Sequence, residues 1–379
     1  MSDPAIQDVL ALTADLVGID SVNPALVAGA AGEHAIASYV RDWAAACGLD
    51  ARTILGPDSR PNVIVRGGRD EGGRTLLLCG HLDTVGQVEP LAAAVDGGRL
   101  YGRGSYDMKA GLAAALVACR DAVAAGISGQ VLVAAVADEE HSSTGIQAVL
   151  QHLTADAAVV TEPTELEVAV AHKGFVWTEI EVIGRAAHGS RPHLGSNAIT
   201  SAAGIVTAVR ELDRELADRP PHPLLGQSTV HAALISGGSG ESTVPELCTL
   251  TLERRTLPGQ SVEEVEADIA GLLERCGRNQ PGLGTRTRTV LARHALETPA
   301  TEPIVTMMLD AATRVDGRPR TPTGLSYWAD SAFLAAAGIP TVLVGPSGDG
   351  AHADTEWVDL DSVLSCTRAL TILACDFAA

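Results

Sequence analysis

The sequence predicts an α/β fold in which a mostly parallel sheet domain is interrupted by an inserted α+β unit. Three observations favour this class. Short apolar runs are bounded by turn residues, Ala-rich stretches with helical spacing lie between them, and apolar and polar residues alternate in a long central segment. The chain has 379 residues, 46% of them hydrophobic, so it can bury a large core. Its length indicates two domains, or three at most.

The apolar runs predict buried strands, because they are short, nearly continuous and followed by turn residues. They lie at residues 62–65, 75–79, 131–136, 157–160 and 341–344. Residues 108–125 and 330–337 are expected to be helices, the second of which ends at Gly338 with Pro340 shortly beyond. Strands that alternate with helices in this way are typical of a largely parallel sheet.

The central segment, residues 175–292, has a different pattern. It contains an alternating strand, an amphipathic helix, two alternating strands, a second helix and a closing strand. This order, βαββαβ, predicts a ferredoxin-like unit inserted into a sheet domain made of residues 1–174 and 293–379. We expect the alternating strand at 248–258 to lie at an edge of the small sheet, where unpaired backbone groups would favour association between copies.

The charge of the chain excludes several classes of partner. The formal net charge is −20 at pH 7, so nucleic acid and anionic membrane surfaces would be repelled. The N-terminus has acidic residues where a secretory signal has a basic start, and no apolar run reaches the roughly 20 residues of a membrane span. A cytoplasmic location is expected.

The cysteines favour neither a disulfide framework nor a thiolate metal site. They are scattered, odd in number and nowhere spaced as Cys-x-x-Cys, at Cys47, Cys79, Cys119, Cys248, Cys276, Cys366 and Cys375. Any metal must therefore be bound by His, Asp and Glu.

Such residues follow several of the predicted strands. His81 and Asp83 come directly after the run at 75–79, and Glu139 and Glu140 follow the run at 131–136 within three consecutive acids. Because the carboxyl ends of parallel strands meet at one edge of a sheet, these side chains are expected to lie close together. A His-x-Asp after a strand is usually an ordinary polar loop, but three adjacent acids repel one another unless a cation is near.

Three further residues extend the pattern. Glu162 ends the next apolar run, His352 follows the run at 341–344, and Asp107 lies in a Gly-rich turn before a predicted helix. Asp107 could equally be a helix N-cap. Their shared position at one sheet edge nevertheless predicts a metal site.

These segments resemble a known family, the dizinc amidohydrolases and exopeptidases that include acetylornithine deacetylase, succinyl-diaminopimelate desuccinylase, aminoacylase and glutamate carboxypeptidase. The resemblance covers essentially the whole chain, through the ordered motifs GHLDTVG, YGRGSYDMKAG, DEEHSSTG, TEPT, AHGSRPHLGSNAI and GAHADTEWV. It implies a catalytic domain, an inserted lid that also forms a homodimer, and two Zn²⁺ ions for which Co²⁺ or Mn²⁺ can substitute.

The resemblance also implies a role for each residue of the predicted site. His81 and Glu162 would bind one metal, His352 and Glu140 the other, and Asp107 would bridge them. Glu139 would be the general base, which takes a proton from water and returns it to the leaving nitrogen. Asp83 would fix the tautomer of His81. The resemblance alone predicts a cis peptide bond between Asp107 and Met108.

The remaining site residues concern the substrate. By resemblance, His188 would stabilise the oxyanion in the partner subunit, and Arg255 would bind a substrate carboxylate. Each also has an alternative interpretation: His188 as an ordinary surface histidine, and Arg255 as the ion-pair partner of a nearby acid. Ser242 stands in Ser-Thr-Val-Pro where many members have an asparagine. The polar contact of that asparagine is therefore either lost here or replaced by one from Ser242. Gly324 and Ser326 are expected to line the substrate pocket.

The resulting function is hydrolysis of an amide bond in an N-acyl amino acid or small peptide with a free carboxylate. Sequence does not separate deacylation from exopeptidase activity. A non-catalytic metal-dependent binding protein on the same fold would have lost the base, but Glu139 is present. A two-metal phosphoesterase would need more basic residues for phosphate than the Arg255 strand offers.

Overall fold

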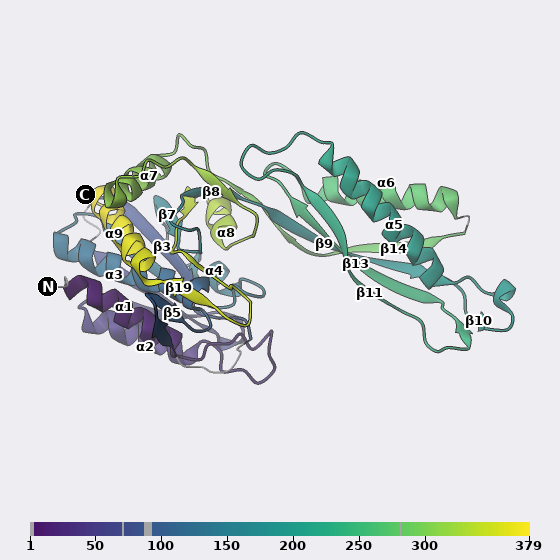
Figure 1. Cartoon of the computed structure of the whole chain (residues 1–379), viewed down its shortest axis with the longest axis horizontal. Coiled ribbons are helices and arrows are strands. Elements are labelled where there is room, and N and C mark those ends of the chain that lie inside the picture. The colour runs from purple at the N-terminus through teal and green to yellow at the C-terminus, as the bar shows by residue number, and fades with distance from the viewer. Residues whose placement is uncertain (1–3, 70–71, 87–92, 281) are drawn as a thin grey trace. The chain divides into compact units, whose positions relative to one another are not determined.

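A computed structural model of the chain describes residues 4–69, 72–86, 93–280 and 282–379 (Figure 1). The chain divides into two compact units. Unit 1 comprises residues 1–170, 298–323 and 329–379, and unit 2 comprises residues 171–297 and 324–328. No helix of the described residues is both long and apolar enough to cross a membrane.

Unit 1 is built on a mixed sheet in which the strand order is β1-β2-β6-β3-β7-β17-β8. The strands are β1 (Asp50–Leu55), β2 (Pro61–Gly68), β3 (Thr75–His81), β6 (Gln130–Val136), β7 (Ala157–Val160), β17 (Thr341–Leu343) and β8 (Ala169–His172), which continues into unit 2. A small antiparallel sheet consists of β18 (Gly348–Asp349), β19 (Trp357–Asp359), β5 (Arg99–Tyr101) and β4 (Ala94–Asp96).

The central strands β6, β3, β7 and β17 are parallel to one another, as the buried apolar runs predicted. The run at 62–65 forms β2, which is antiparallel to both β1 and β6. The antiparallel pairing with β1 follows from the connection, because only residues 56–60 separate β1 from β2, and so short a link permits a hairpin but no parallel crossover.

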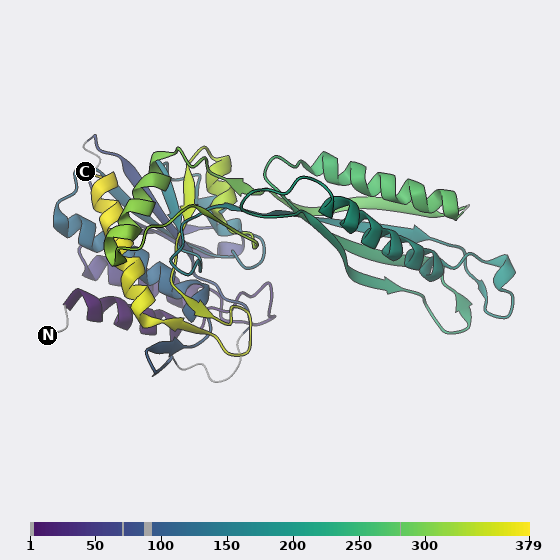
Figure 2. The ribbon, with the colours of Figure 1, turned by 45° about the horizontal axis from the view of Figure 1, so that its top comes forward.

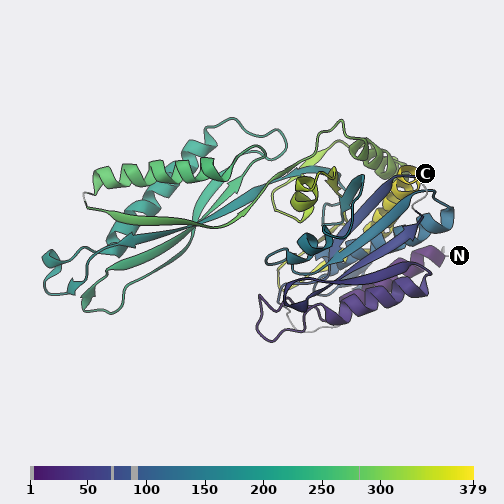
Figure 3. The ribbon, with the colours of Figure 1, turned by 180° about the vertical axis from the view of Figure 1, so that it is seen from behind.

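Helices cover both faces of this sheet. They are α1 (Pro4–Val17), α2 (His34–Ala46), α3 (Ala110–Ala125), α4 (Thr144–Val149), α7 (Pro303–Asp316), α8 (Ser331–Ala336) and α9 (Leu360–Phe377), with short turns at η1 (Pro57–Ser59) and η2 (Ser105–Lys109). Leu76 and Leu78 join the core formed with α1, α3, α7 and α9. The alternate residue Leu77 is equally buried, and α4 and α8 lie on the other face (Figures 1 and 3).

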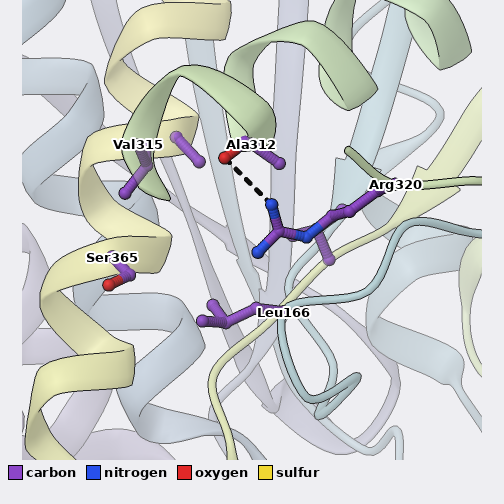
Figure 4. Close-up of a pocket in the computed structure, with 7 residues that line it drawn as sticks. Leu166, Ala312, Val315, Arg320 and Ser365 are labelled. Atoms are coloured by element: carbon purple, nitrogen blue, oxygen red, sulfur yellow. Dashed lines mark hydrogen bonds between the residues drawn. The ribbon is translucent and has the colours of Figure 1, made fainter. Parts of the chain in front are cut away.

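A small cavity of about 10 Å³ lies in unit 1 between α7, α9 and the end of β17 (Figure 4). The Arg320 side chain lines it and donates to the carbonyl oxygen of Ala312 at 3.0 Å. Arg320 also forms an ion pair with Asp316 at 2.7 Å. The cavity can hold about one water molecule, so it is a packing feature and no substrate site.

Unit 2 has the predicted βαββαβ order. Its elements are β9 (Gly174–Ile183), β10 (Ala187–His188), η3 (Pro192–Leu194), α5 (Ala198–Ala217), β11 (Thr229–Gly237), β12 (Thr243–Val244), β13 (Leu247–Thr256), α6 (Val262–Asn279), β14 (Gly284–Arg293) and β15 (Leu296–Glu297), followed much later by β16 (Thr323–Leu325). The four long strands form an antiparallel sheet in the order β11-β13-β9-β14. Helices α5 and α6 lie side by side on one face of it (Figure 2).

The expectation that 248–258 forms an edge strand is wrong. This segment forms β13, which pairs with β11 on one side and β9 on the other. Its alternation reflects one face packed against the helices, where Cys248, Leu250 and Leu252 are buried. The edges are β11 and β14, and on β11 the Leu234 and Ile235 side chains are largely exposed.

Candidate metal centre

The strands of unit 1 bring the predicted ligands to one edge of the sheet. His81 is the last residue of β3, and it lies level with Val136, the last residue of the parallel neighbour β6. Glu139 and Glu140 follow β6, and Glu162 follows β7 on the other side of β3. Because these strands are parallel, their carboxyl ends and the side chains that follow converge.

Asp107 reaches the same place from the turn η2, which leads into α3. Its peptide bond to Met108 is cis, as predicted, and neither residue has helical backbone angles. The helix therefore begins at Ala110 and not at Met108. Gly111 allows α3 to pack directly on the end of β7, since a Cβ atom there would lie 2.0 Å from the carbonyl oxygen of Thr161.

The Asp107 carboxylate lies between two imidazoles. Its Oδ1 is 3.2 Å from Nε2 of His81, and its Oδ2 is 3.3 Å from Nε2 of His352. Glu162 lies 4.0 Å from the same nitrogen of His81, and Glu140 lies 3.0 Å from that of His352. The five residues thus form two potential metal-binding groups, His81–Asp107–Glu162 and Asp107–Glu140–His352, which share Asp107.

The carboxylates of this cluster are buried beside one another. Burial, reinforced by the charge of Asp107, raises the pKa of Glu162 well above its ordinary value. Burial, reinforced by the charge of Glu162, does the same to the pKa of Glu139. Carboxylates so placed are stable in their ionised form only when a positive charge compensates them.

The imidazoles show the complementary effect. Hydrogen bonds with Asp107 and Glu140 raise the pKa of His352 to about 10. Burial acts to lower the pKa of His81, but the hydrogen bond with Asp107 and the charge of Glu162 outweigh it and raise that pKa. Divalent cations can replace these protons, and the nitrogen and oxygen donors suit zinc, with cobalt or manganese as substitutes. The residues present therefore fit a two-metal site.

Asp83 meets His81 in a different way from the one expected. Nδ1 of His81 lies 2.8 Å from the backbone carbonyl oxygen of Asp83, whereas the Asp83 carboxylate is 3.8 Å away. That carboxylate instead accepts hydrogen bonds from the backbone N–H groups of Glu139 and Glu140, at 3.1 and 3.2 Å. Asp83 thus contacts both His81 and the segment that carries the predicted base.

Sequence reasoning missed a buried network behind this segment. The side-chain amide of Asn23 donates to Asp83 at 2.8 Å and to Asp138 at 3.2 Å. Arg60 forms ion pairs with Asp138 and Glu33. The partners of Asn23 lie 60 and 115 residues away along the chain, so no local spacing signals them.

The predicted substrate residues all belong to unit 2, where they form two separate groups. His188 pairs with Thr243 across β10 and β12, and the N–H of Gly189 donates to the carbonyl oxygen of Ser242. Arg255 is the second-last residue of β13, at the opposite end from Ser242. Within this unit, therefore, His188 and Arg255 do not meet.

Arg255 lies among aromatic residues. Its guanidinium is 5.4 Å from the centre of the Phe175 ring and forms an ion pair with Glu253 at 2.8 Å. The Trp328 ring is nearly perpendicular to the same Phe175 ring, with the two ring centres 6.0 Å apart. Gly324 and the exposed Ser326 lie in the segment that ends at Trp328, so the segment predicted to line the pocket shares this end of unit 2 with Arg255.

Comparison with known families agrees with the geometry of the site. Residues 77–376 match the model of Peptidase family M20/M25/M40. The chain belongs to this family. It is therefore a metallohydrolase of the peptidase and deacylase kind, as the motifs implied. Its similarity extends to an acetylornithine deacetylase of Myxococcus xanthus, 29% identical over 81% of each chain, and to one of Photorhabdus laumondii, 27% identical over 95% of this chain and 91% of the relative.

Solved structures of the family have the same fold. An aminopeptidase from Bacillus cereus superimposes with a TM-score of 0.80 at 19% identity and covers 99% of both chains. An M20 family metallo-carboxypeptidase from Sulfolobus solfataricus gives 0.77 at 18% identity over the whole of both chains. A dinuclear metal-binding peptidase from Bacillus subtilis gives 0.74 at 15% identity over 98% of both chains. This M20-type hydrolase therefore shares with these structures an α/β fold that has a separate antiparallel unit.

Proposed function

We propose that this M20-type hydrolase cleaves an amide bond of an N-acyl amino acid or small peptide that has a free carboxylate, with two zinc ions. One observation carries the proposal. The two oxygens of Asp107 are directed at imidazoles that belong to two different ligand groups. One carboxylate shared in this way is the arrangement that a bridged pair of cations requires.

Glu139 is the proposed base. Among the described residues, neither ligand group includes it, although the charges of Glu162, His81 and Glu140 all act on its carboxyl. Two bound cations would polarise the amide carbonyl and acidify a water molecule. Glu139 would accept the proton of that water and return it to the leaving nitrogen. The Asp83 carboxylate would hold Glu139 in place by accepting a hydrogen bond from the backbone N–H of Glu139.

Arg255 is the proposed binding group for the substrate carboxylate. The guanidinium can donate two parallel hydrogen bonds to a carboxylate, and its neighbour Phe175 offers an apolar surface for the rest of a small substrate. Ser242, Gly324 and Ser326 are proposed as further substrate contacts. Relatives that are named acetylornithine deacetylase support an N-acyl amino acid as the substrate class.

A homodimer is proposed as the active form. His188 and Arg255 lie at different ends of unit 2, so one lid cannot by itself present both to one substrate. A lid from a second copy could supply His188 as the oxyanion donor. The edge strand β11, with Leu234 and Ile235 exposed, gives such an association both unpaired backbone groups and apolar surface.

The test is a substrate screen with the zinc- or cobalt-loaded protein. N-acetyl amino acids, N-succinyl amino acids and dipeptides are expected to release free amine, and their C-terminal amides are not. Arg255→Ala should raise KM for the acids, because it removes the carboxylate contact, whereas Arg286→Ala on exposed β14 is the matched control and should not. If protein with two bound metals hydrolyses none of these amides, the non-catalytic binding protein becomes the better account.

A further inference from the structure

Glu356 is a buried carboxylate that lies beside the metal centre and is not among its ligands. Glu356 follows His352 by four residues and immediately precedes β19, and it is only 4% exposed. Strand β19 pairs with β5, so that Trp357 lies opposite Tyr101. This pairing brings Glu356 against the loop that leads from Tyr101 to Asp107.

Both oxygens of Glu356 accept two hydrogen bonds each from that loop. Oε1 accepts the backbone N–H groups of Tyr106 and Asp107, at 2.9 and 3.0 Å. Oε2 accepts the N–H of Gly104 at 2.9 Å and a guanidinium N–H of Arg103 at 2.7 Å. These four donors satisfy the Glu356 carboxylate, and the bond from the Asp107 N–H fixes the backbone at Asp107 itself.

Arg103 extends this connection to the segment of His352. It donates to the carbonyl oxygen of Ala353, the residue after His352, at 2.6 Å. The N–H of Gly102 also donates to the backbone carbonyl of Glu356 at 3.1 Å. The loop that carries the shared carboxylate and the loop that carries His352 are thus joined through Glu356 and Arg103.

We propose that Glu356 is a positioning residue that holds Asp107 between the two imidazoles and keeps the His352 segment in register with it. The proposal rests on the proposed two-metal function. Glu356 would act through the backbone N–H of Asp107 and would touch neither metal nor substrate. Partners of metal ligands typically contribute about 10- to 100-fold to metal affinity or activity.

Glu356→Gln is the most direct test, because the amide has the size of the carboxyl group. One oxygen becomes an NH₂ group, which faces two N–H donors that then lose their acceptor. We expect zinc to bind about 10- to 100-fold more weakly in a competition assay with a chelator. Asp354→Asn removes the same charge from an exposed residue of the same loop and should bind zinc as the wild type does.

Hydrogen exchange of the zinc-free proteins separates positioning from general stability. In Glu356→Gln the amides of residues 102–109 should exchange faster, while those of β3, β6 and β7 should keep wild-type rates. Glu356→Asp, which keeps the charge, should show a smaller effect on both readouts. Unchanged zinc affinity and unchanged exchange would overturn the proposal, and so would faster exchange throughout the chain. If the wild type binds no zinc, the proposed function fails, but exchange at 102–109 still decides the role of Glu356.

Discussion

Glu139→Gln is expected to keep both metals and to lose turnover by about 10²- to 10⁴-fold. The reason is that the side chain of Glu139 belongs to neither ligand group, whereas its charge interacts with Glu162, His81 and Glu140. The amide has the size of the carboxyl group but cannot accept a proton. Because one group is proposed to act in both proton transfers, the loss should lie toward the upper end of this range and should appear in kcat.

Glu140→Gln provides the comparison for this variant. Glu140 lies 3.0 Å from His352 within a ligand group, so its substitution should reduce the bound metal as well as the activity. Metal analysis of the two variants alongside kcat therefore separates the base from a ligand. Activity of Glu139→Gln within a few-fold of the wild type would assign the base to another residue.

His188→Ala is expected to lower kcat by about 10²- to 10³-fold, as the loss of one oxyanion donor does in other hydrolases. If the donor acts in the partner's site, mixing this variant with Glu139→Gln should restore activity that neither variant has alone. One site of each mixed dimer would then contain an intact base and an intact donor. Free exchange of subunits limits the recovery to about a quarter of wild-type activity.

His193→Ala is the matched control, because His193 is an exposed histidine on the same stretch after β10. It should leave kcat unchanged and should need no complementation. Subunit exchange can be followed with two differently tagged chains. If mixed dimers form and no activity returns, His188 acts within its own chain or takes no part in the reaction.

The sheet edge and its ligands could be predicted because their signals are local. The runs that became β3, β6 and β7 are continuous and apolar, and each is followed within a few residues by His81, Glu140 or Glu162. Because these strands are parallel, the side chains that follow them converge at one edge of the sheet. Asp107 and His352 have weaker local signals, because Asp107 could equally be a helix N-cap and several residues separate His352 from the end of β17.

The supporting contacts could not be predicted, because they join residues that are distant in the chain. Glu356 binds a loop about 250 residues earlier, and Asn23 binds acids 60 and 115 residues later. The position of β13 inside its sheet shows a related limit. Its alternation indicates that one face is buried, but alternation is the same for an edge strand and for an interior strand of an antiparallel sheet.

The proposed hydrolysis requires this chain to bind two metals that share Asp107. Anomalous diffraction at the zinc absorption edge, from crystals prepared with zinc and without chelator, tests it most directly. Two peaks are expected, one beside His81 and Glu162 and the other beside His352 and Glu140, with Asp107 between them. A single peak, or peaks away from these five residues, would contradict it.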